Sequence, residues 1–266
     1  MKKRSQNMLT GPLLPAVIRY TIPIILTSWL QLLFNAADLI VVGQANGSNS
    51  LAAVGATGAI TNLIVNLFIG LSVGAGVTVA HGLGGNDEEA VHRTIHTAIP
   101  AAAISGLFLT VVGVCCSRVF LIWMGTPENI LPLSTLYMQI YFGGMVFNMV
   151  YNFAASILRA AGDTKSPLIF LGLSGLINVG LNLIFVLFCG MDVDGVGWAT
   201  VISQVVSAVL CLLYMRKKYP EILPKKEDSM METKVIAEAQ DMTENQKSIL
   251  ISRPKASYVS CVKPRG

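Results

Sequence analysis

Residues 51–81 read LAAVGATGAITNLIVNLFIGLSVGAGVTVAH, a run without a single Asp, Glu, Lys or Arg. An α-helix of about 20 predominantly apolar residues crosses the hydrocarbon layer of a bilayer. In lipid the backbone has to satisfy its own hydrogen bonds, and a helix does so within one segment. The run therefore predicts a transmembrane α-helix.

Similar apolar stretches lie on both sides of this run and are separated by short polar breaks. The chain of 266 residues is 53% hydrophobic and only 13% charged, whereas about a quarter of the residues in a soluble domain are charged. The sequence therefore predicts an all-α membrane protein with six transmembrane helices. We place these helices at residues 14–42, 51–81, 94–122, 131–157, 167–189 and 195–215.

The basic residues indicate how the helices are oriented. Lys or Arg occurs in the N-terminal segment and in the stretches 82–93, 158–166 and 216–226, but not in the loops 43–50, 123–130 and 190–194. Basic loops face the cytoplasm, so we expect a multi-pass protein of the cell (plasma) membrane with both termini cytoplasmic. The first apolar run is too long for the core of a cleavable signal peptide, so we expect it to be a membrane helix.

The character of the chain changes after about residue 218. Residues 219–266 have mixed charge and no sustained apolar period, a composition typical of segments without a packed core. We therefore expect two parts: a six-helix transmembrane lobe at 1–218 and a polar, mostly disordered cytoplasmic tail at 219–266.

One carboxylate lies well inside a predicted span. Thr27, Gln31, Asn35 and Asp38 follow one another at spacings of four, four and three, so they share one face of the first helix. An isolated carboxylate in this setting is either neutral or paired with a cation, which suits a site that exchanges a proton with Na⁺ or a cationic substrate. Alternatively, Asp38 reaches the outer interface of the membrane.

Three further spans carry amide pairs four residues apart, at Asn62 and Asn66, Asn148 and Asn152, and Asn178 and Asn182. Each pair lies on one helical face. Amide oxygens can bind hard cations, and amides also form hydrogen bonds between membrane helices. With Gln31, Asn35 and Asp38, the three pairs favour a shared polar cavity.

Several function classes are disfavoured. A net charge of +4, with basic residues at the ends of spans, does not suggest nucleic-acid binding. The sequence has no nucleophile elbow, Walker A or HExxH motif, so we expect no enzymatic activity. The five cysteines show no metal-binding spacing.

Four stretches resemble the N-terminal half of the multidrug and toxic compound extrusion family, the MATE transporters. They are LLFNAADLIVVGQ (32–44), LAAVGATGAITNLIVNLFIGLSVGAGVTVAHGLGGNDEEA (51–90), ILRAAGDTKSPL (157–168), and INVGLNLIFV (177–186) followed by GVGWATVIS (195–203). The resemblance covers roughly residues 10–218. It implies an antiporter that exports small amphipathic organic compounds, often cationic, in exchange for H⁺ or Na⁺. It also implies a cavity between two six-helix lobes.

The resemblance further implies a cation site in this lobe. Asp38 matches the acidic residue of the first helix, Asn178 a ligand of the fifth helix, and Thr200 a hydroxyl ligand of the sixth. Val196 falls where a backbone carbonyl contributes, and Asn182 falls where many members have an Asp. The implied ligands are thus Asp38, Asn178, Asn182, Val196 and Thr200, with no cofactor or metal beyond the coupling ion. Gln31, Asn35, Asn62, Asn66, Asn148 and Asn152 would line the substrate cavity.

Family members have two lobes, whereas this sequence resembles one. The lobe could pair with a second copy or with another chain in the lipid bilayer, because alternating access needs two lobes. Two alternatives are a truncated, non-transporting fragment and a flippase of related architecture for lipid-linked substrates. The flippase would need a basic cavity, and the spans contain few cationic residues.

Overall fold

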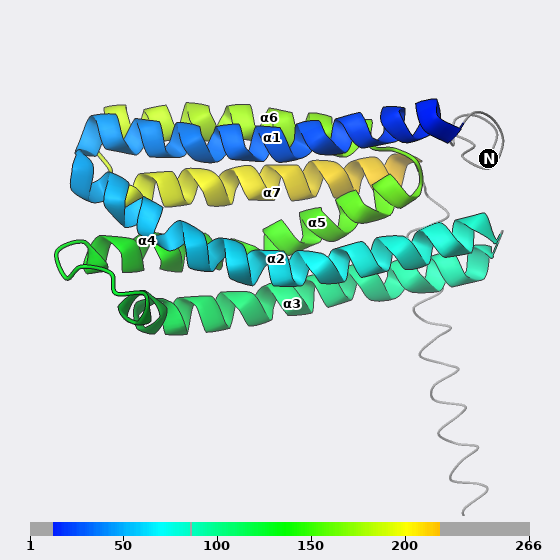
Figure 1. Ribbon diagram of the computed structural model, residues 1–266, viewed down its shortest axis with the longest axis horizontal. Coiled ribbons are helices and arrows are strands. Elements are labelled where there is room, and N and C mark those ends of the chain that lie inside the picture. The colour runs from blue at the N-terminus through cyan, green and yellow to red at the C-terminus, as the bar shows by residue number, and fades with distance from the viewer. Residues whose placement is uncertain (1–12, 86, 219–266) are drawn as a thin grey trace, which may run out of the picture. The chain divides into compact units, whose positions relative to one another are not determined.

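The computed structural model describes residues 13–85 and 87–218, and this part of the chain is built of helices (Figure 1). Their bounds are α1 Leu13–Asn46, α2 Ser48–Gly84, α3 Glu88–Trp123, α4 Leu131–Gly143, α5 Met145–Ala160, α6 Lys165–Leu183, the π-helix η1 Ile184–Phe188 and α7 Val193–Lys218. The predicted tail at 219–266 lies outside the described residues.

The helices are long and apolar enough to cross a membrane. Among the described residues five single helices qualify, and the bent pair of α4 and α5 makes a sixth when it is taken as one span. The predicted all-α membrane class with six spans is thereby confirmed. Large apolar side chains such as Leu67 and Leu107 remain exposed on the described surface, which suits contact with lipid.

The first three helices are longer than their predicted spans. α2 has 37 residues, so at about 1.5 Å per residue it is roughly 55 Å long, whereas the hydrocarbon layer is about 30 Å thick. Each of these helices must tilt or continue beyond the lipid. Hydropathy marks only the lipid-contacting part, which is why the predicted bounds are too short.

The span predicted at 131–157 is present as the bent pair, but the expectation of one continuous helix there was wrong. α4 and α5 meet at Gly144 with a bend of 48°. A kink frees backbone groups that lipid cannot satisfy. Here the hydroxyl of Thr110 on α3 donates to the carbonyl oxygen of Phe142 at 2.8 Å, so a polar side chain from the neighbouring helix compensates the break.

The connection from α6 to α7 begins with a wide turn. η1 continues α6 for five residues as a π-helix, and Gly190 then takes a positive φ of 65°, which glycine adopts without strain. The amide of Asn46, at the end of α1, donates to Asp192 Oδ1 at 2.8 Å. These contacts fix the end of α1 against the start of α7.

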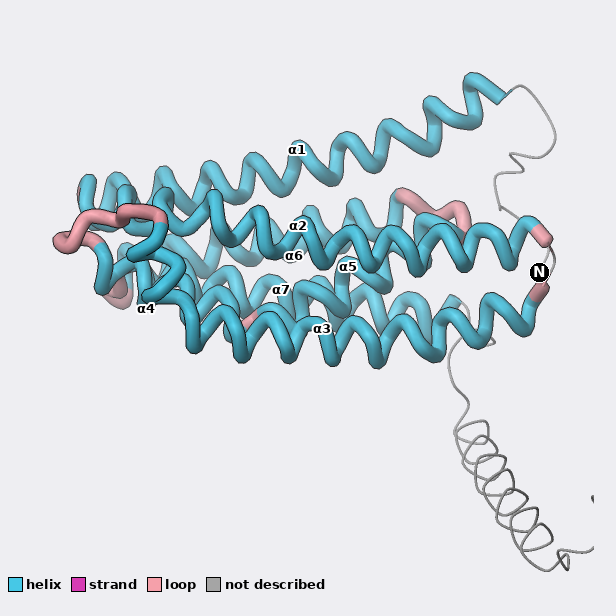
Figure 2. Tube along the Cα trace, turned by 60° about the horizontal axis from the view of Figure 1, so that its bottom comes forward, coloured by secondary structure: helices cyan, strands magenta, loops and turns pink. Residues whose placement is uncertain are grey.

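Loops gather at the two ends of the bundle (Figure 2). Three groups of buried side chains form its core. One, with Ile95 and Met215, joins α2, α3, α5 and α7 near the end where α1 begins. A second, with Val42 and Val196, lies toward the opposite end. The third, around Phe142, joins α2 and α3 to the bent pair.

The turn between α5 and α6 is held by the carboxylate of Asp163. Its Oδ1 accepts from the backbone N–H of Ser166 at 3.1 Å, and its Oδ2 accepts from the Ser166 hydroxyl at 2.9 Å and the Tyr214 hydroxyl at 2.8 Å. The ammonium group of Lys218 forms an ion pair with the same oxygen. Partial burial raises the pKa of Asp163, but the hydrogen bonds from Lys218, Tyr214 and Ser166 outweigh it, so the pKa lies below its ordinary value. The Asp163 cluster, meaning these four residues, thus joins α6 to the end of α7.

Candidate functional site

Three helices bring the predicted cation ligands together. Asp38 comes from α1, Asn178 and Asn182 from α6, and Thr200 from α7. The first three are buried, with exposed fractions of 6%, 4% and 0%. Spacings of four residues place the two asparagines on one face of α6, and place Val196 and Thr200 on one face of α7.

Hydrogen bonds link these side chains into one group. The amide nitrogen of Asn182 donates to Asp38 Oδ1 at 2.5 Å and lies 3.5 Å from Asn178 Oδ1. The amide nitrogen of Asn178 lies 3.4 Å from the Thr200 hydroxyl, which donates to the carbonyl oxygen of Val196 at 2.9 Å. We call Asp38, Asn178, Asn182, Val196 and Thr200 the Asp38 group.

One acceptor of the group has no donor. The amide oxygen of Asn182 is buried and lacks a hydrogen-bond partner within the described residues. Turning the amide over would point this oxygen at the Asp38 carboxylate and remove the donor from it, so the carboxylate sets the orientation. An unsatisfied buried acceptor costs about 1–3 kcal/mol. A bound cation would give this oxygen a partner.

The Asp38 group supplies the ligand chemistry that a hard monovalent cation needs. Carboxylate, amide, hydroxyl and backbone carbonyl oxygens are all hard donors, and each occurs in the group. The bonds just described run between these same atoms, so a cation would replace contacts within the group. Either a proton on Asp38 or a small cation beside it would neutralise the buried charge.

Close packing of α1 on α6 positions the carboxylate. Gly175 lies one turn before Asn178, and a Cβ at Gly175 would be only 1.9 Å from the ring of Phe34 on α1. The absence of a side chain therefore lets Phe34 pack against the backbone of α6. Asp38 follows Phe34 by four residues on α1 and so faces α6 as well.

Two tyrosines near this group were missed by the sequence reasoning. Tyr137 and Tyr141 on α4 stack with their ring centroids 6.2 Å apart, and Tyr137 lies in the same buried cluster as Val42 and Val196, with Tyr141 packed against it. The available signal was their spacing of four residues, which places both rings on one helical face. The amide pairs were singled out by the same spacing.

The side chains predicted to line a substrate cavity do not join the Asp38 group. Gln31, Asn35, Asn62 and Asn66 are exposed on the described lobe, and Asn148 and Asn152 are half-buried. The amide of Asn152 donates to Asn148 Oδ1 at 2.9 Å. Among the described residues, none of the six has a hydrogen bond to the group.

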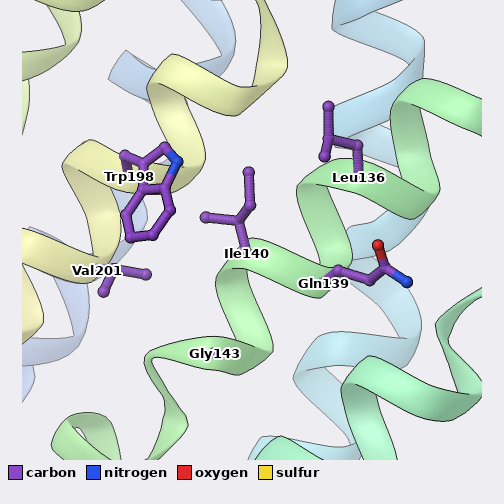
Figure 3. A pocket seen from close by; sticks show the side chains of 6 residues that line it. All are labelled: Leu136, Gln139, Ile140, Gly143, Trp198 and Val201. Carbon is purple, nitrogen blue, oxygen red and sulfur yellow. The ribbon is translucent and has the colours of Figure 1, made fainter.

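A groove lies between α4 and α7 (Figure 3). It has a volume of about 310 Å³ and is mostly apolar. Its lining residues are Leu136, Gln139, Ile140 and Gly143 of α4 and Trp198 and Val201 of α7. The groove adjoins the break between α4 and α5.

Comparison with known proteins places the chain among transporters. The family described as MatE matches residues 23–184. The probable multidrug resistance protein YoeA of Bacillus subtilis (strain 168) is 29% identical over 203 residues, which is 75% of this chain and 44% of YoeA. The probable multidrug resistance protein YpnP of the same organism is 26% identical over 214 residues, which is 80% of this chain and 48% of YpnP.

The fold also resembles solved structures. A crystal structure of MATE in the bent conformation superposes with a TM-score of 0.77 at 25% identity, covering 85% of this chain and 52% of the solved one. The chain thus spans about half the length of the relatives it matches.

Proposed function

The chain belongs to the MatE family of transporters, and from this premise we propose that it forms one lobe of a multidrug antiporter. The antiporter exports organic, often cationic compounds in exchange for H⁺ or Na⁺. The relatives named as multidrug resistance proteins support this class of substrate. The protein resides in the plasma membrane with both termini cytoplasmic, an orientation supported by the alternating basic loops.

The buried Asp38 carboxylate beside the unsatisfied oxygen of Asn182 carries the proposal. Burial makes an uncompensated charge costly, so the carboxylate binds a cation or a proton from one side of the membrane and releases it to the other. Asn178, Thr200 and the Val196 carbonyl supply the remaining oxygens. For a neutral substrate, one elementary charge moving down about 100 mV supplies roughly 2.3 kcal/mol. Exchange for a monovalent cation moves no net charge, so the concentration gradient of the coupling ion drives that export.

Alternating access needs a second lobe. A further part of the same protein, a second copy of this lobe or another chain would supply it. The exposed amides Gln31, Asn35, Asn62 and Asn66 would face the cavity between the lobes. Hydrogen-bonding groups among apolar side chains suit amphipathic substrates.

The test is dye export from proteoliposomes that contain the purified chain, with an imposed H⁺ or Na⁺ gradient. Asp38→Asn removes the charge with little change in shape and should abolish gradient-driven export. Asp87→Asn is the matched control, because Asp87 is an exposed N-cap of α3 and Asn caps equally well. Export that persists in Asp38→Asn would exclude this carboxylate from the coupling mechanism.

A chain that exports nothing by itself can still be tested for the cation site. Equilibrium binding of radioactive Na⁺ to the chain in nanodiscs, with pH as a second variable, measures the site directly. Wild-type binding that is lost in Asp38→Asn supports the site. Equal binding by both proteins contradicts it.

A further inference from the structure

Two histidines lie together near the start of α3. His92 and His96 are four residues apart, so they lie on one helical face. Their Nε2 atoms are 3.2 Å apart and their ring centroids 4.2 Å apart, and both side chains are half-buried. Neither histidine belongs to the Asp38 group or to the Asp163 cluster, so the proposed function does not use this pair.

Packing against α2 sets the direction of the two side chains. Val91 and Ile95 are buried in the core, and each immediately precedes one of the histidines. A Cβ at Gly82 of α2 would lie only 2.7 Å from a methyl group of Val91, so the two helices are in close contact here. This contact fixes the rotation of α3 about its axis, and the histidines therefore lie at the edge of its buried face.

The distance between the two Nε2 atoms fits a metal chelate. Zn²⁺ binds imidazole nitrogens at about 2.0–2.1 Å in tetrahedral geometry. Two nitrogens at that distance from one ion, with a tetrahedral angle between them, are about 3.3–3.4 Å apart. The observed 3.2 Å is nearly this spacing, so a small adjustment of the rings would let both nitrogens bind one ion.

The same distance also fits a hydrogen bond, in which Nε2–H of one ring donates to Nε2 of the other. A metal ion needs the lone pair of both nitrogens, so the donating ring has to carry its proton on Nδ1 instead. This change of tautomer keeps both rings neutral and releases no proton. The hydrogen bond therefore holds the two rings close together without preventing metal binding.

The surroundings of the pair suit a divalent cation that arrives from water. The start of α3 carries Asp87, Glu88 and Glu89, so the charge of this segment is mainly negative. Glu89 forms an ion pair with Arg93, and their side chains are 82% and 74% exposed. Charged side chains exposed in this way belong in water and not in lipid. A dissolved ion can therefore reach His92, which lies between Glu89 and Arg93 in the sequence.

We propose that His92 and His96 chelate a divalent transition-metal ion of the Zn²⁺ type through both Nε2 atoms, in addition to the coupling ion. Imidazole suits Zn²⁺, Cu²⁺ and Ni²⁺, whereas Mg²⁺ prefers oxygen ligands. Within the part of the chain that the structure describes, no group of three or more His, Cys, Asp or Glu side chains could hold a metal ion, so water completes the coordination. The site is separate from the Asp38 group, which lies on α1, α6 and α7.

The experiment titrates Zn²⁺ into the whole chain in nanodiscs, without an affinity tag, and measures binding by isothermal titration calorimetry. His92→Gln and His96→Gln each leave one imidazole of the pair. Binding to a second ligand on the same helix is intramolecular, so we expect each variant to weaken Zn²⁺ binding by about 10²-fold or more. His81→Gln is the matched control, because His81 is an exposed histidine of α2, and it should bind as wild type does.

X-ray absorption at the zinc edge identifies the ligands of the bound ion. We expect two imidazole nitrogens at about 2.0–2.1 Å in wild type and one in each pair variant, with no sulfur at about 2.3 Å. This measurement separates the histidine pair from the cysteines, which would bind Zn²⁺ through sulfur. An excess of Mg²⁺ should leave Zn²⁺ binding unchanged, and far-UV circular dichroism confirms that each variant is folded.

Each outcome supports or overturns the pair as a metal site. Wild-type protein that binds no Zn²⁺, or that binds it with a sulfur ligand or with fewer than two imidazoles, overturns the proposal. Equal affinity in wild type and both pair variants overturns it as well, as does an equal loss of affinity in His81→Gln. Asp38→Asn should bind Zn²⁺ as wild type does, so failure of this site and failure of the proposed function are measured separately.

Discussion

Removing the carboxylate of Asp163 should destabilise the end of the bundle where α1 begins. In Asp163→Ala, the N–H of Ser166 in the first turn of α6 loses its acceptor, which costs about 1 kcal/mol. The lost bonds from Tyr214 and Lys218 add about 2 kcal/mol, a modest value because Lys218 is 41% exposed. We therefore expect the free energy of unfolding to fall by about 3 kcal/mol, measured by SDS titration in mixed micelles with far-UV circular dichroism.

Asp87→Ala is the control for this variant. Asp87 accepts one exposed hydrogen bond, from Ala90 N at 2.9 Å, so its loss should cost about 1 kcal/mol or less. If Asp163→Ala destabilises the protein no more than Asp87→Ala does, the Asp163 cluster does not stabilise the bundle as its geometry implies.

The carboxylate of Asp163 also predicts how the free energy of unfolding depends on pH. Hydrogen bonds and the ion pair hold the pKa of Asp163 below its ordinary value against the effect of burial. Its contribution to stability is therefore complete above the unfolded pKa of about 3.9 and is lost as the pH falls through the lower folded pKa. The difference in stability between wild type and Asp163→Ala should be constant near neutral pH and shrink in acid. A difference that grows in acid would contradict this assignment.

Two further variants test the packing and chemistry around Asp38. Gly175→Ala should lower the free energy of unfolding by about 1–3 kcal/mol, because the added methyl group collides with the ring of Phe34. The control is Gly55→Ala, where a Cβ meets nothing within 4 Å. SDS titration should show no loss of stability in this control. Asn182→Asp puts a second carboxylate beside Asp38, so their repulsion should make thermal stability depend more steeply on Na⁺ concentration than in wild type; an unchanged dependence would argue against cation binding there.

The number and position of the spans followed from the sequence because lipid imposes a strong pattern on it. Each predicted span overlaps one helix or the bent pair. The ends of α1, α2 and α3 could not be predicted in this way. A helix can continue beyond the lipid through polar residues, and hydropathy marks only the apolar part. The 131–157 prediction missed the break because the apolar pattern runs through it unchanged. The adjacent glycines Gly143 and Gly144 were the only local sign.

For the candidate site, a carboxylate in an apolar span and the spacing of Asn178 and Asn182 were visible in the sequence. The resemblance to a known family added Val196 and Thr200. The hydrogen bond that the Asn182 amide donates to Asp38 was not predictable, because it depends on how closely α1 packs on α6. Tyr137 and Tyr141 were missed because aromatic residues in an apolar span read as packing.

Because the π-helix η1 follows Asn182, a change in the number of its residues does not alter the directions of Asn178 and Asn182 on α6. Its five residues, Ile184–Phe188, form a wider turn than an α-helix would, so this short stretch holds a residue that a regular helix would not need. Losing one residue here would convert the turn to α-helix and leave Asn178 and Asn182 in register with Asp38. The same loss between Asn178 and Asn182 would rotate one amide by about 100° relative to the other. A change of length after Asn182 therefore preserves the register of the two asparagines, and the connection that follows η1 has to keep Val196 and Thr200 in place.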